Sequence, residues 1–446
     1  MVDAELLLQQ LQKAGYEVGY ETGCETDGNV QNSVQACEQG HALGAATEEE
    51  VIIVNTCGFI GSAKEESVNV ILEQVARKKA GIVKHLLVMG CLSQRYGADL
   101  QKELPEVDAF FGKFDWKGIL AYLGAQYDEN LANERLLTTP SHYAYLKISE
   151  GCNRTCSYCA IPIMTGSYKS RPMESLVEEC KSLVARGVKE IILIAQDLTY
   201  YGTDIYGKNC IADLVSTLSD IKGVEWIRLH YAYPVDSAAT SASTWVTGLL
   251  AVMRERANVC KYLDIALQHC SDRMLGLMRR GINKQQTVDL IRTLRQEVPG
   301  IFLRTTLMVG HPGETKEDFE ELCAFVKEMK FERLGVFAYS HEEDTYCDRH
   351  YKDDVPQAVK KRRVEKIMKV QQELSDELSA SLIGKAYKVL IDRQEGDYYV
   401  GRTEHDSPEI DTDVLVKTDV KLRLGEFCDV LIKDHEGFDL YGELCP

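Results

Sequence analysis

The middle of the chain alternates between segments that favour strands and segments that favour helices, and this alternation restricts the fold more than any other feature. One expected helix, Met173–Arg186, follows Pro172 and precedes Gly187, which are the residues that helix boundaries prefer. Strands that alternate with helices form a parallel sheet. The pattern predicts an α/β fold whose central part, residues 138–355, is an incomplete (β/α)8 barrel with six units. The expected strands are Tyr143–Ser149, Glu190–Gln196, Glu225–Tyr231, Tyr262–Leu267, Phe302–Val309 and Leu334–Tyr339.

Polar residues and glycines stand at the ends of these strands. Gln196 and Asp197 follow the second strand, Gln268 follows the fourth, and Gly310 follows the fifth, while His230 closes the third. In barrel enzymes the site forms at the carboxyl ends of the strands. A single residue of this kind is more often structural, so it is the series that predicts a working site.

Three cysteines follow the first strand, with the spacing Cys152-x-x-x-Cys156-x-x-Cys159. A structural zinc site needs four ligands, usually in two close pairs. Three thiolates suit a four-iron, four-sulfur cluster with one open iron, which can bind and activate a small molecule. The motif therefore predicts a reaction centre, with a degenerate zinc knuckle or three free thiols as the alternatives.

The first 125 residues are expected to form a separate α/β unit. An amphipathic helix, Ala4–Ala14, precedes two apolar segments, Val51–Asn55 and His85–Met89, that are typical of buried strands. The segments lead to Cys57 and Cys91 respectively, so parallel pairing would bring the two thiols together.

Two thiols are one fewer than a three-cysteine cluster site needs. The chain also opens on a helix, whereas a doubly wound unit begins with a strand, so we expect a strand with its own cysteine upstream of Met1. Cys24 and Cys37 lie in a polar stretch, Glu21–Glu50, that we expect to be a loop. Either could supply the third ligand, although a lone loop cysteine is usually just exposed.

The C-terminal fifth of the chain has a different pattern. Residues 356–380 are expected to form a charged helical linker, in which Lys360–Arg363 would be a solvated face. Residues 381–446 show short alternating strands and turns, which predict a small β-barrel. This segment has eight Lys/Arg against fifteen Asp/Glu, a net charge of about −7. An acidic barrel favours a basic protein surface over RNA.

Bulk composition narrows the function classes. A net charge of −18 argues against strong binding to nucleic acid. We see neither a secretory signal nor an apolar stretch of about 20 residues, so we expect a cytoplasmic protein without a membrane span. The fifteen cysteines then indicate thiols and metal ligands rather than disulfides.

Together these features resemble the radical S-adenosylmethionine (SAM) methylthiotransferases over nearly the whole chain. The resemblance implies an N-terminal cluster domain, a TIM-like radical SAM barrel and a C-terminal barrel known as TRAM. Several short sequence motifs resemble those of one branch of this family. That branch modifies an aspartate of a small-subunit ribosomal protein, the twelfth in the usual naming. The motifs are Val54–Ile60, Ser62–Ser67, Ala195–Asp197, Tyr201–Asp204 and Arg228–Pro234.

The resemblance implies a transferase of sulfur-containing groups with two 4Fe-4S clusters. Cys152, Cys156 and Cys159 would hold the catalytic cluster, whose open iron chelates SAM. Cys57 and Cys91 would hold part of a second cluster that carries the sulfur to be inserted. A 5′-deoxyadenosyl radical would abstract hydrogen from the aspartate β-carbon, which no acid–base residue could deprotonate near neutral pH.

The resemblance also implies cofactor contacts and partners. A reductant such as flavodoxin or ferredoxin would supply electrons, and the substrate would be the free ribosomal protein or the assembled subunit. For each implied contact the alternative is a structural polar group at the end of a strand or helix. The implied SAM contacts are Tyr158, Gln196, Asp197, Gln268, Gly310, Arg171 and Glu174.

Three other functions stay open. A tRNA methylthiotransferase acting on a modified adenosine beside the anticodon would share the scaffold, although the acidic C-terminal barrel and the Gln196-Asp197 word favour a protein substrate. A non-catalytic iron–sulfur protein would not need the polar strand ends. A truncated form that cleaves SAM without inserting sulfur would follow from the missing thiol.

Overall fold

The computed structural model describes residues 2–22, 32–38, 51–131, 133–235 and 245–445. The chain forms two compact units. The first comprises Met1–Thr138, Ala160–Ser167 and Ser340–Asp344, and the second comprises Thr139–Cys159, Tyr168–Tyr339 and Thr345–Pro446. Within the described residues, no helix is long and apolar enough to cross a membrane.

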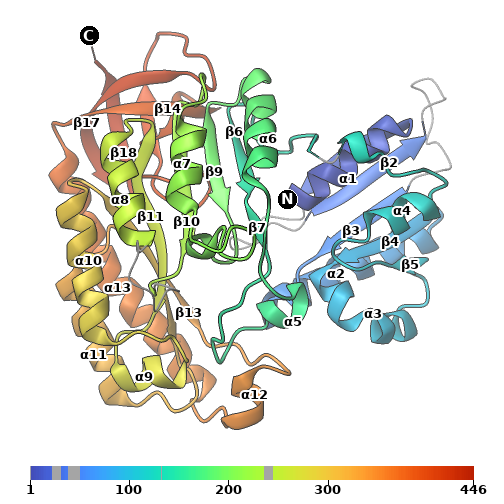
Figure 1. Cartoon of the computed structure of the whole chain (residues 1–446), viewed down its shortest axis with the longest axis horizontal. Coiled ribbons are helices and arrows are strands. Elements are labelled where there is room, and N and C mark those ends of the chain that lie inside the picture. Colours follow the sequence, from blue (N-terminus) through green and yellow to red (C-terminus); the bar gives the residue numbers. More distant parts are fainter. Residues whose placement is uncertain (1, 23–31, 39–50, 132, 236–244, 446) are drawn as a thin grey trace. The chain divides into compact units, whose positions relative to one another are not determined.

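The first unit is built on a five-stranded sheet with the order β1-β2-β3-β4-β5 (Figure 1). β3, β4 and β5 run parallel, while β2 is antiparallel to both β1 and β3. The strands are β1 (Tyr16–Thr22), β2 (Asn32–Glu38), β3 (Val51–Thr56), β4 (His85–Gly90) and β5 (Ala109–Phe110). The helices are α1 (Val2–Lys13), α2 (Gly61–Lys79), α3 (Cys91–Glu103), α4 (Trp116–Tyr122), η1 (Glu129–Leu131) and α5 (Ile161–Thr165).

Both faces of this sheet are covered. Ile53 of β3 packs in a core cluster with Leu7 of α1 and Ile119 of α4. Its neighbour Ile52 packs in another cluster with Ile71 of α2. Because successive strand side chains point to opposite faces, a strand covered on both sides is apolar throughout. The two predicted buried strands and the opening helix are thus confirmed.

The expectation that residues 21–50 form a loop is wrong for 32–38, where β2 joins β1 to β3. The polar composition of this segment gave no strand pattern in the sequence. A strand can still form there because the ladder between two strands depends on backbone hydrogen bonds more than on side chains. Cys24 lies outside the described residues, and the side chain of Cys37 is not among those described. Their suggested ligand role stays a prediction.

The second unit contains a six-stranded parallel sheet with the order β13-β12-β11-β10-β9-β6. All six predicted strands are present and the sheet does not close, which confirms the partial barrel. The strands are β6 (Tyr143–Lys147), β9 (Glu190–Ile194), β10 (Trp226–Ala232), β11 (Val259–Gln268), β12 (Phe302–Val309) and β13 (Arg333–Ala338). The short β7 (Ser149–Glu150) and β8 (Lys169–Ser170) pair beside it.

Helices run along the outer side of this sheet (Figure 1). They are α6 (Met173–Ala185), α7 (Ile211–Ser219), α8 (Trp245–Glu255), α10 (Lys284–Glu297) and α11 (Lys316–Met329). The unit also contains the short helices η2 (Leu198–Tyr200), α9 (Asp272–Leu277) and α12 (Tyr346–His350). β12 shows the expected period of two, since Leu303, Thr305 and Leu307 are buried while Arg304 and Thr306 are half-buried. One face of the sheet is therefore sealed and the other is partly open.

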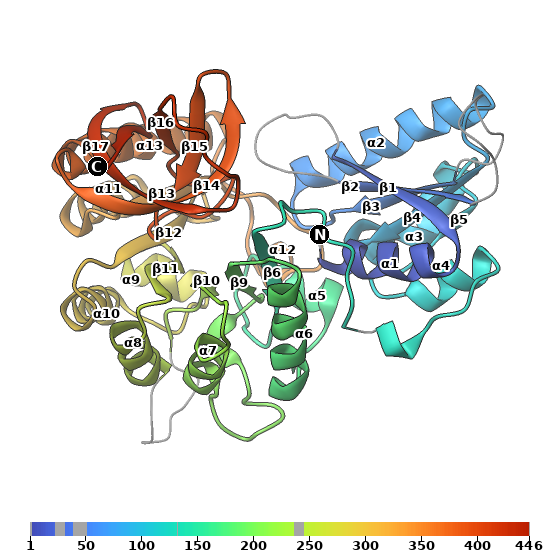
Figure 2. The same ribbon diagram turned by 90° about the horizontal axis from the view of Figure 1, so that it is seen from above.

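The C-terminal segment forms a closed five-stranded barrel with the order β14-β15-β16-β18-β17 (Figure 2). The small β-barrel predicted from the sequence is confirmed. The long helix α13 (Gln357–Leu382) leads into it. The strands are β14 (Ala386–Glu395), β15 (Tyr398–Arg402), β16 (Val414–Lys417), β17 (Phe427–Glu436) and β18 (Asp439–Leu444).

The barrel and the parallel sheet share one core. Val389 and Val430 of the barrel cluster with Trp226, Tyr262 and Phe302 at the amino ends of the sheet strands. Burial of this apolar surface joins two predicted domains in one compact unit. The predicted domain bounds themselves stay a prediction.

Buried ion pairs reinforce this junction. Arg228 pairs with Glu190 at 2.7 Å, and Arg402 of the barrel pairs with the same carboxylate at 2.8 Å. His230, which sequence analysis grouped with the strand-end site, contacts Ser407 of the barrel at 2.9 Å. His230 is therefore engaged in the junction.

The expectation of a solvated basic run on α13 is wrong for two of its four residues. Lys361 and Arg362 are exposed, but Lys360 and Arg363 are buried. Residues three apart share a helix face, and this face packs toward Asp353 and Glu314.

Candidate functional site

The three clustered cysteines lie on the loop that follows β7. Cys152 is buried, and Cys156 and Cys159 are half-buried. The loop is fixed by its own backbone, because Ser157 donates to the Met278 carbonyl at 3.0 Å. The cysteines therefore stand at the carboxyl side of β6, as the sequence predicts.

Two of the sulfur atoms accept hydrogen bonds from nitrogen. The backbone N–H of Arg154 donates to Cys152 Sγ at 3.4 Å, and the Arg280 guanidinium donates to Cys156 Sγ at 3.3 Å. Burial raises the pKa of Cys152 to about 11, since a thiolate there loses its hydration. Donors aimed at sulfur suit thiolates that are bound to iron.

These side chains fit a cluster better than a single ion. In the part of the chain that the structure describes, no three His, Cys, Asp or Glu side chains are placed to hold one metal ion. The thiolates of a 4Fe-4S cluster bind different irons, so they need not converge on one point. Three sulfurs on one fixed loop match that donor set. Their assignment as ligands stays a prediction.

Asp197 lies beside the cysteine loop. It accepts from Arg154 Nε at 2.7 Å, and its other oxygen accepts from the Thr199 N–H and hydroxyl at 3.0 and 2.6 Å. Gln196 donates to Glu150, at the end of β7, at 2.7 Å. The second strand end is thus brought to the loop, as the series of strand ends implied.

Gly310 and Gln268 lie at neighbouring strand ends. Both have positive φ, 74° and 71°, which is uncommon for glutamine. A Cβ on Gly310 would overlap the Lys360 side chain, so only glycine allows this approach. His311 contacts Ser157 of the cysteine loop at 3.1 Å through its Nε2. The glycine segment and the loop are therefore coupled.

The remaining predicted contacts differ in position. Tyr158 is half-buried and its hydroxyl accepts from Arg280 at 3.2 Å. Arg171 pairs with Glu179 at 2.6 Å and donates to the Lys147 carbonyl. Glu174 is exposed in the first turn of α6. Tyr158 thus lies with the cysteines, whereas the acidic partner of Arg171 is a different glutamate. Their predicted role in binding SAM stays a prediction.

Sequence reasoning missed Arg154, Tyr233 and Arg280. Arg154 lies over the Tyr233 ring, 4.1 Å from its centroid, and Tyr233 contacts Cys156 Sγ at 3.7 Å. The sequence could have indicated Arg154, which lies inside the cysteine motif, and Tyr233, which lies in the segment Arg228–Pro234 that resembles the family. Arg280 follows α9 with no motif around it, so only the tertiary structure reveals it.

Cys57 and Cys91 occupy equivalent positions in the first unit. They directly follow Thr56 and Gly90, which are register partners in the parallel pair β3–β4. A Cβ on Gly58 would lie 2.9 Å from the Cys91 carbonyl carbon, so the two loops are in close contact. Parallel pairing thus brings the two loops together, as predicted.

Cys57 and Cys91 are the two cysteines of the first unit whose side chains the structure describes. The two side chains fit part of a three-thiolate cluster site. Burial raises the pKa of Cys57. The ligand role of both cysteines stays a prediction.

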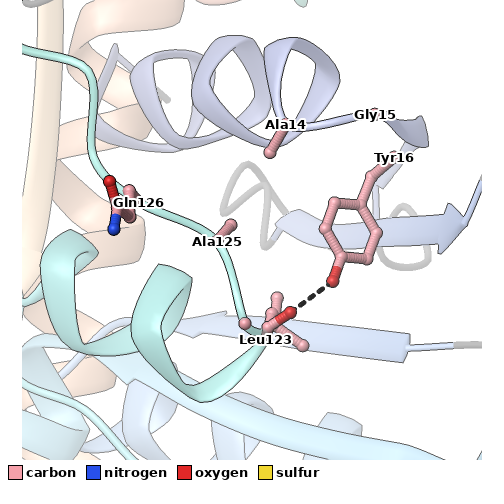
Figure 3. A pocket seen from close by; sticks show the side chains of 7 residues that line it. Ala14, Gly15, Tyr16, Leu123, Ala125 and Gln126 are labelled. Atoms are coloured by element: carbon pink, nitrogen blue, oxygen red, sulfur yellow. Dashed lines mark hydrogen bonds between the residues drawn. The ribbon is translucent and has the colours of Figure 1, made fainter.

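A pocket of about 520 Å³ lies in the first unit, between the end of α1 and the segment after α4 (Figure 3). Tyr16 closes one side by donating to the Leu123 carbonyl at 2.6 Å. Small side chains and backbone line the rest, and the two cysteines are not among its lining residues. We assign it no catalytic role.

Comparison with known proteins adds to this geometry. The sequence matches the Radical SAM superfamily over residues 146–326, the TRAM domain over 383–445 and the family described as "Uncharacterized protein family UPF0004" over 21–112. Among solved structures, the cobalamin-dependent SAM radical enzyme OxsB with aqua-cobalamin bound has a TM-score of 0.47 at 12% identity, over 72% of this chain and 48% of that one. Since this score is below 0.5, the fold assignment rests on the elements described above.

Full-length relatives are much more similar. "Ribosomal protein uS12 methylthiotransferase RimO" of Parabacteroides distasonis is 53% identical over 444 residues, which is 100% of this chain and 96% of the relative. The proteins of the same name from Porphyromonas gingivalis strain W83 and Bacteroides thetaiotaomicron are each 54% identical over all of this chain and over 96% and 95% of the relative. The chain belongs to the RimO family of radical SAM methylthiotransferases.

Proposed function

We propose that this chain inserts a methylthio group at the β-carbon of an aspartate in ribosomal protein uS12. The names of its relatives include this protein as the one that they modify. One observation carries the proposal: a complete three-cysteine loop stands at the carboxyl edge of a partial barrel, in a chain that matches RimO over its whole length. The substrate is the free protein or the assembled subunit, which would place the reaction in the cytoplasm.

The family membership makes this chain a radical SAM enzyme that uses SAM and two iron–sulfur clusters. When bound, the cofactors supply a radical that can remove hydrogen from an unactivated carbon. Cys152, Cys156 and Cys159 would hold the cluster that binds SAM. An external one-electron donor, such as a flavodoxin or ferredoxin, would reduce it.

The chain's own residues hold this loop in place. Asp197 accepts three hydrogen bonds, one of them from Arg154 of the loop, and a carboxylate retains further acceptor sites. The pair therefore positions the cysteine loop and leaves Asp197 able to accept from a ligand. Gln268 and Gly310 lie at adjacent strand ends, which supports their proposed place beside SAM.

Cys57 and Cys91 would contribute two thiolates to the second cluster, and the source of the third ligand decides whether it forms. Iron counting tests this directly, because about eight irons per chain indicate two clusters and about four indicate one. A count of four, with SAM cleavage intact, would favour a form that cannot insert sulfur.

The decisive experiment incubates anaerobically reconstituted protein with SAM, a reductant and either uS12, small subunits or tRNA. We expect a methylthio mass gain on the uS12 aspartate and none on tRNA. Cys156→Ala should abolish the product, whereas Cys445→Ala, in the C-terminal barrel, is the matched control. Modification of tRNA alone would reject the protein substrate, and absence of SAM cleavage would reject the radical function.

A further inference from the structure

Arg280 is a buried arginine held tightly by the backbone around it. Only 3% of the residue's surface is exposed to solvent. Its N–H donates to the Leu275 carbonyl at 3.0 Å, and its carbonyl accepts from the Tyr233 hydroxyl at 2.9 Å. The position of the guanidinium is therefore set by the fold.

The guanidinium points at the cysteine loop. It donates to Cys156 Sγ at 3.3 Å, to the Tyr158 hydroxyl at 3.2 Å and to the Ala266 carbonyl, and it lies 4.2 Å from the centroid of the Tyr233 ring. Its Nε is buried and has no hydrogen-bond partner among the residues that the structure describes. The charge thus meets sulfur, phenol and carbonyl groups.

Other buried arginines of this chain have carboxylate partners. Arg228 pairs with Glu190 at 2.7 Å, Arg135 with Glu5 at 2.8 Å, and Arg333 with Asp406 at 2.5 Å. Within the described residues, Arg280 forms no such ion pair with a carboxylate. An uncompensated buried charge is strongly unfavourable, so its retention points to an anion that the chain alone does not supply.

We propose that Arg280 is the counter-charge of the cluster held by Cys152, Cys156 and Cys159, and that it raises the reduction potential of that cluster. The inference rests on the proposed function, which supplies the cluster. Three thiolates around an oxidised core of charge +2 carry a net charge of −1, and one electron from an external donor makes it −2. A fixed positive charge stabilises the more negative form, and so favours reduction.

Arg154, which also lies near the loop, is less suited to this role because Asp197 neutralises it at 2.7 Å. Arg279 offers a matched control. It is the adjacent residue, it is exposed, and its guanidinium lies over the Tyr346 ring instead of a cysteine. Removing its charge changes the formal charge of the chain equally.

The test uses the full chain with Cys57→Ala and Cys91→Ala, so that one cluster is observed. Arg280→Met, Arg280→Lys and Arg279→Met are compared by iron content, by electron paramagnetic resonance and by the reduced fraction at a fixed potential. At the poise that half-reduces the parent, we expect Arg280→Met to lower the ratio of reduced to oxidised cluster about tenfold, which is 59 mV for one electron. Arg280→Lys should lower it less, and Arg279→Met should leave it unchanged.

The cluster-free protein supplies a second readout. Because Arg280→Met removes an unpaired buried charge, its melting temperature without the cluster should equal or exceed that of the parent. A clear fall would show that Arg280 stabilises the fold alone, and would overturn the proposal.

Three further outcomes would also support or refute the proposed role of Arg280. A loaded Arg280→Met cluster with an unchanged potential would refute the role. If neither Arg280→Met nor Arg280→Lys held iron while both stayed folded, the function of Arg280 would be packing and not charge. Iron retained by the lysine variant alone would support the proposal. None of these readouts involves uS12, so failure of the substrate assignment would be seen separately.

Discussion

The two cysteine sites of this chain are built in different ways. The central site takes three cysteines from one short loop, and buried groups such as Arg280 donate to their sulfurs. The N-terminal site takes Cys57 and Cys91 from two strands whose register aligns them. A loop site depends on local spacing and on what contacts the loop, whereas a register site depends on correct strand pairing. Substitutions at the thiols and in the strand pairing should therefore affect the two sites differently.

The largest effect should come from removing single thiols. We expect Cys156→Ala to abolish SAM cleavage, because the cluster that binds SAM loses a ligand. Cys57→Ala should leave SAM cleavage within about twofold of the parent and abolish methylthiolation. Quantifying 5′-deoxyadenosine and modified uS12 in the same samples measures both. Equal loss of cleavage in both variants would erase the distinction between the sites.

Gly90→Ala should test the register site. Gly90 has φ 109°, and a Cβ there would overlap the backbone of Thr56. We expect the free energy of unfolding to fall by about 2–4 kcal/mol. Gly81→Ala is the control, since Gly81 also has positive φ but nothing lies within 4 Å of its Cβ position, so about 1 kcal/mol is expected. Denaturant unfolding measures both, and equal losses would contradict the close contact.

The loop site should show a pH dependence through His311, which contacts Ser157. Burial lowers the pKa of His311 to about 4, whereas an unfolded histidine binds its proton near 6.5. The unfolded chain therefore binds more protons between these values, so this contribution to stability is complete above pH 6.5 and is lost as the pH falls toward 4.

The loss of stability should reach roughly 3 kcal/mol at the acid end. We expect His311→Asn to reduce the difference in unfolding free energy of the cluster-free chain between pH 7 and pH 4.5. His350→Asn is the control, because His350 is exposed. The same pH slope in the parent and in His311→Asn would show that His311 does not titrate in this way.

The smallest effect concerns the ion pair that holds the loop. Asp197→Ala should leave Arg154 without its carboxylate and lower the rate of SAM cleavage about tenfold, with iron content retained. Asp213→Ala, which removes the exposed partner of Lys208, should stay within about twofold. If the two variants behaved alike, the pair would have no part in positioning the loop.

Much of the fold could be predicted because its signals are local. Strand and helix periodicity located all six strands of the parallel sheet, and the short alternating segments indicated the C-terminal barrel. The spacing of Cys152, Cys156 and Cys159 marked the loop. The strand β2 escaped because its segment is polar, and Lys360 and Arg363 were misjudged because their neighbours in sequence are exposed.

The sequence by itself determined the order of elements, the cysteine loop and the family, since each is encoded in neighbouring residues. Only the tertiary structure placed Arg280 against Cys156, 124 positions away, and joined the C-terminal barrel to the parallel sheet through Arg402 and Glu190. The tertiary structure also fixed the strand register that aligns Cys57 with Cys91, although the hydrophobic periodicity had suggested that the two strands pair. These contacts depend on packing between distant segments, where burial and charge pairing choose the partner, and no local pattern records that choice.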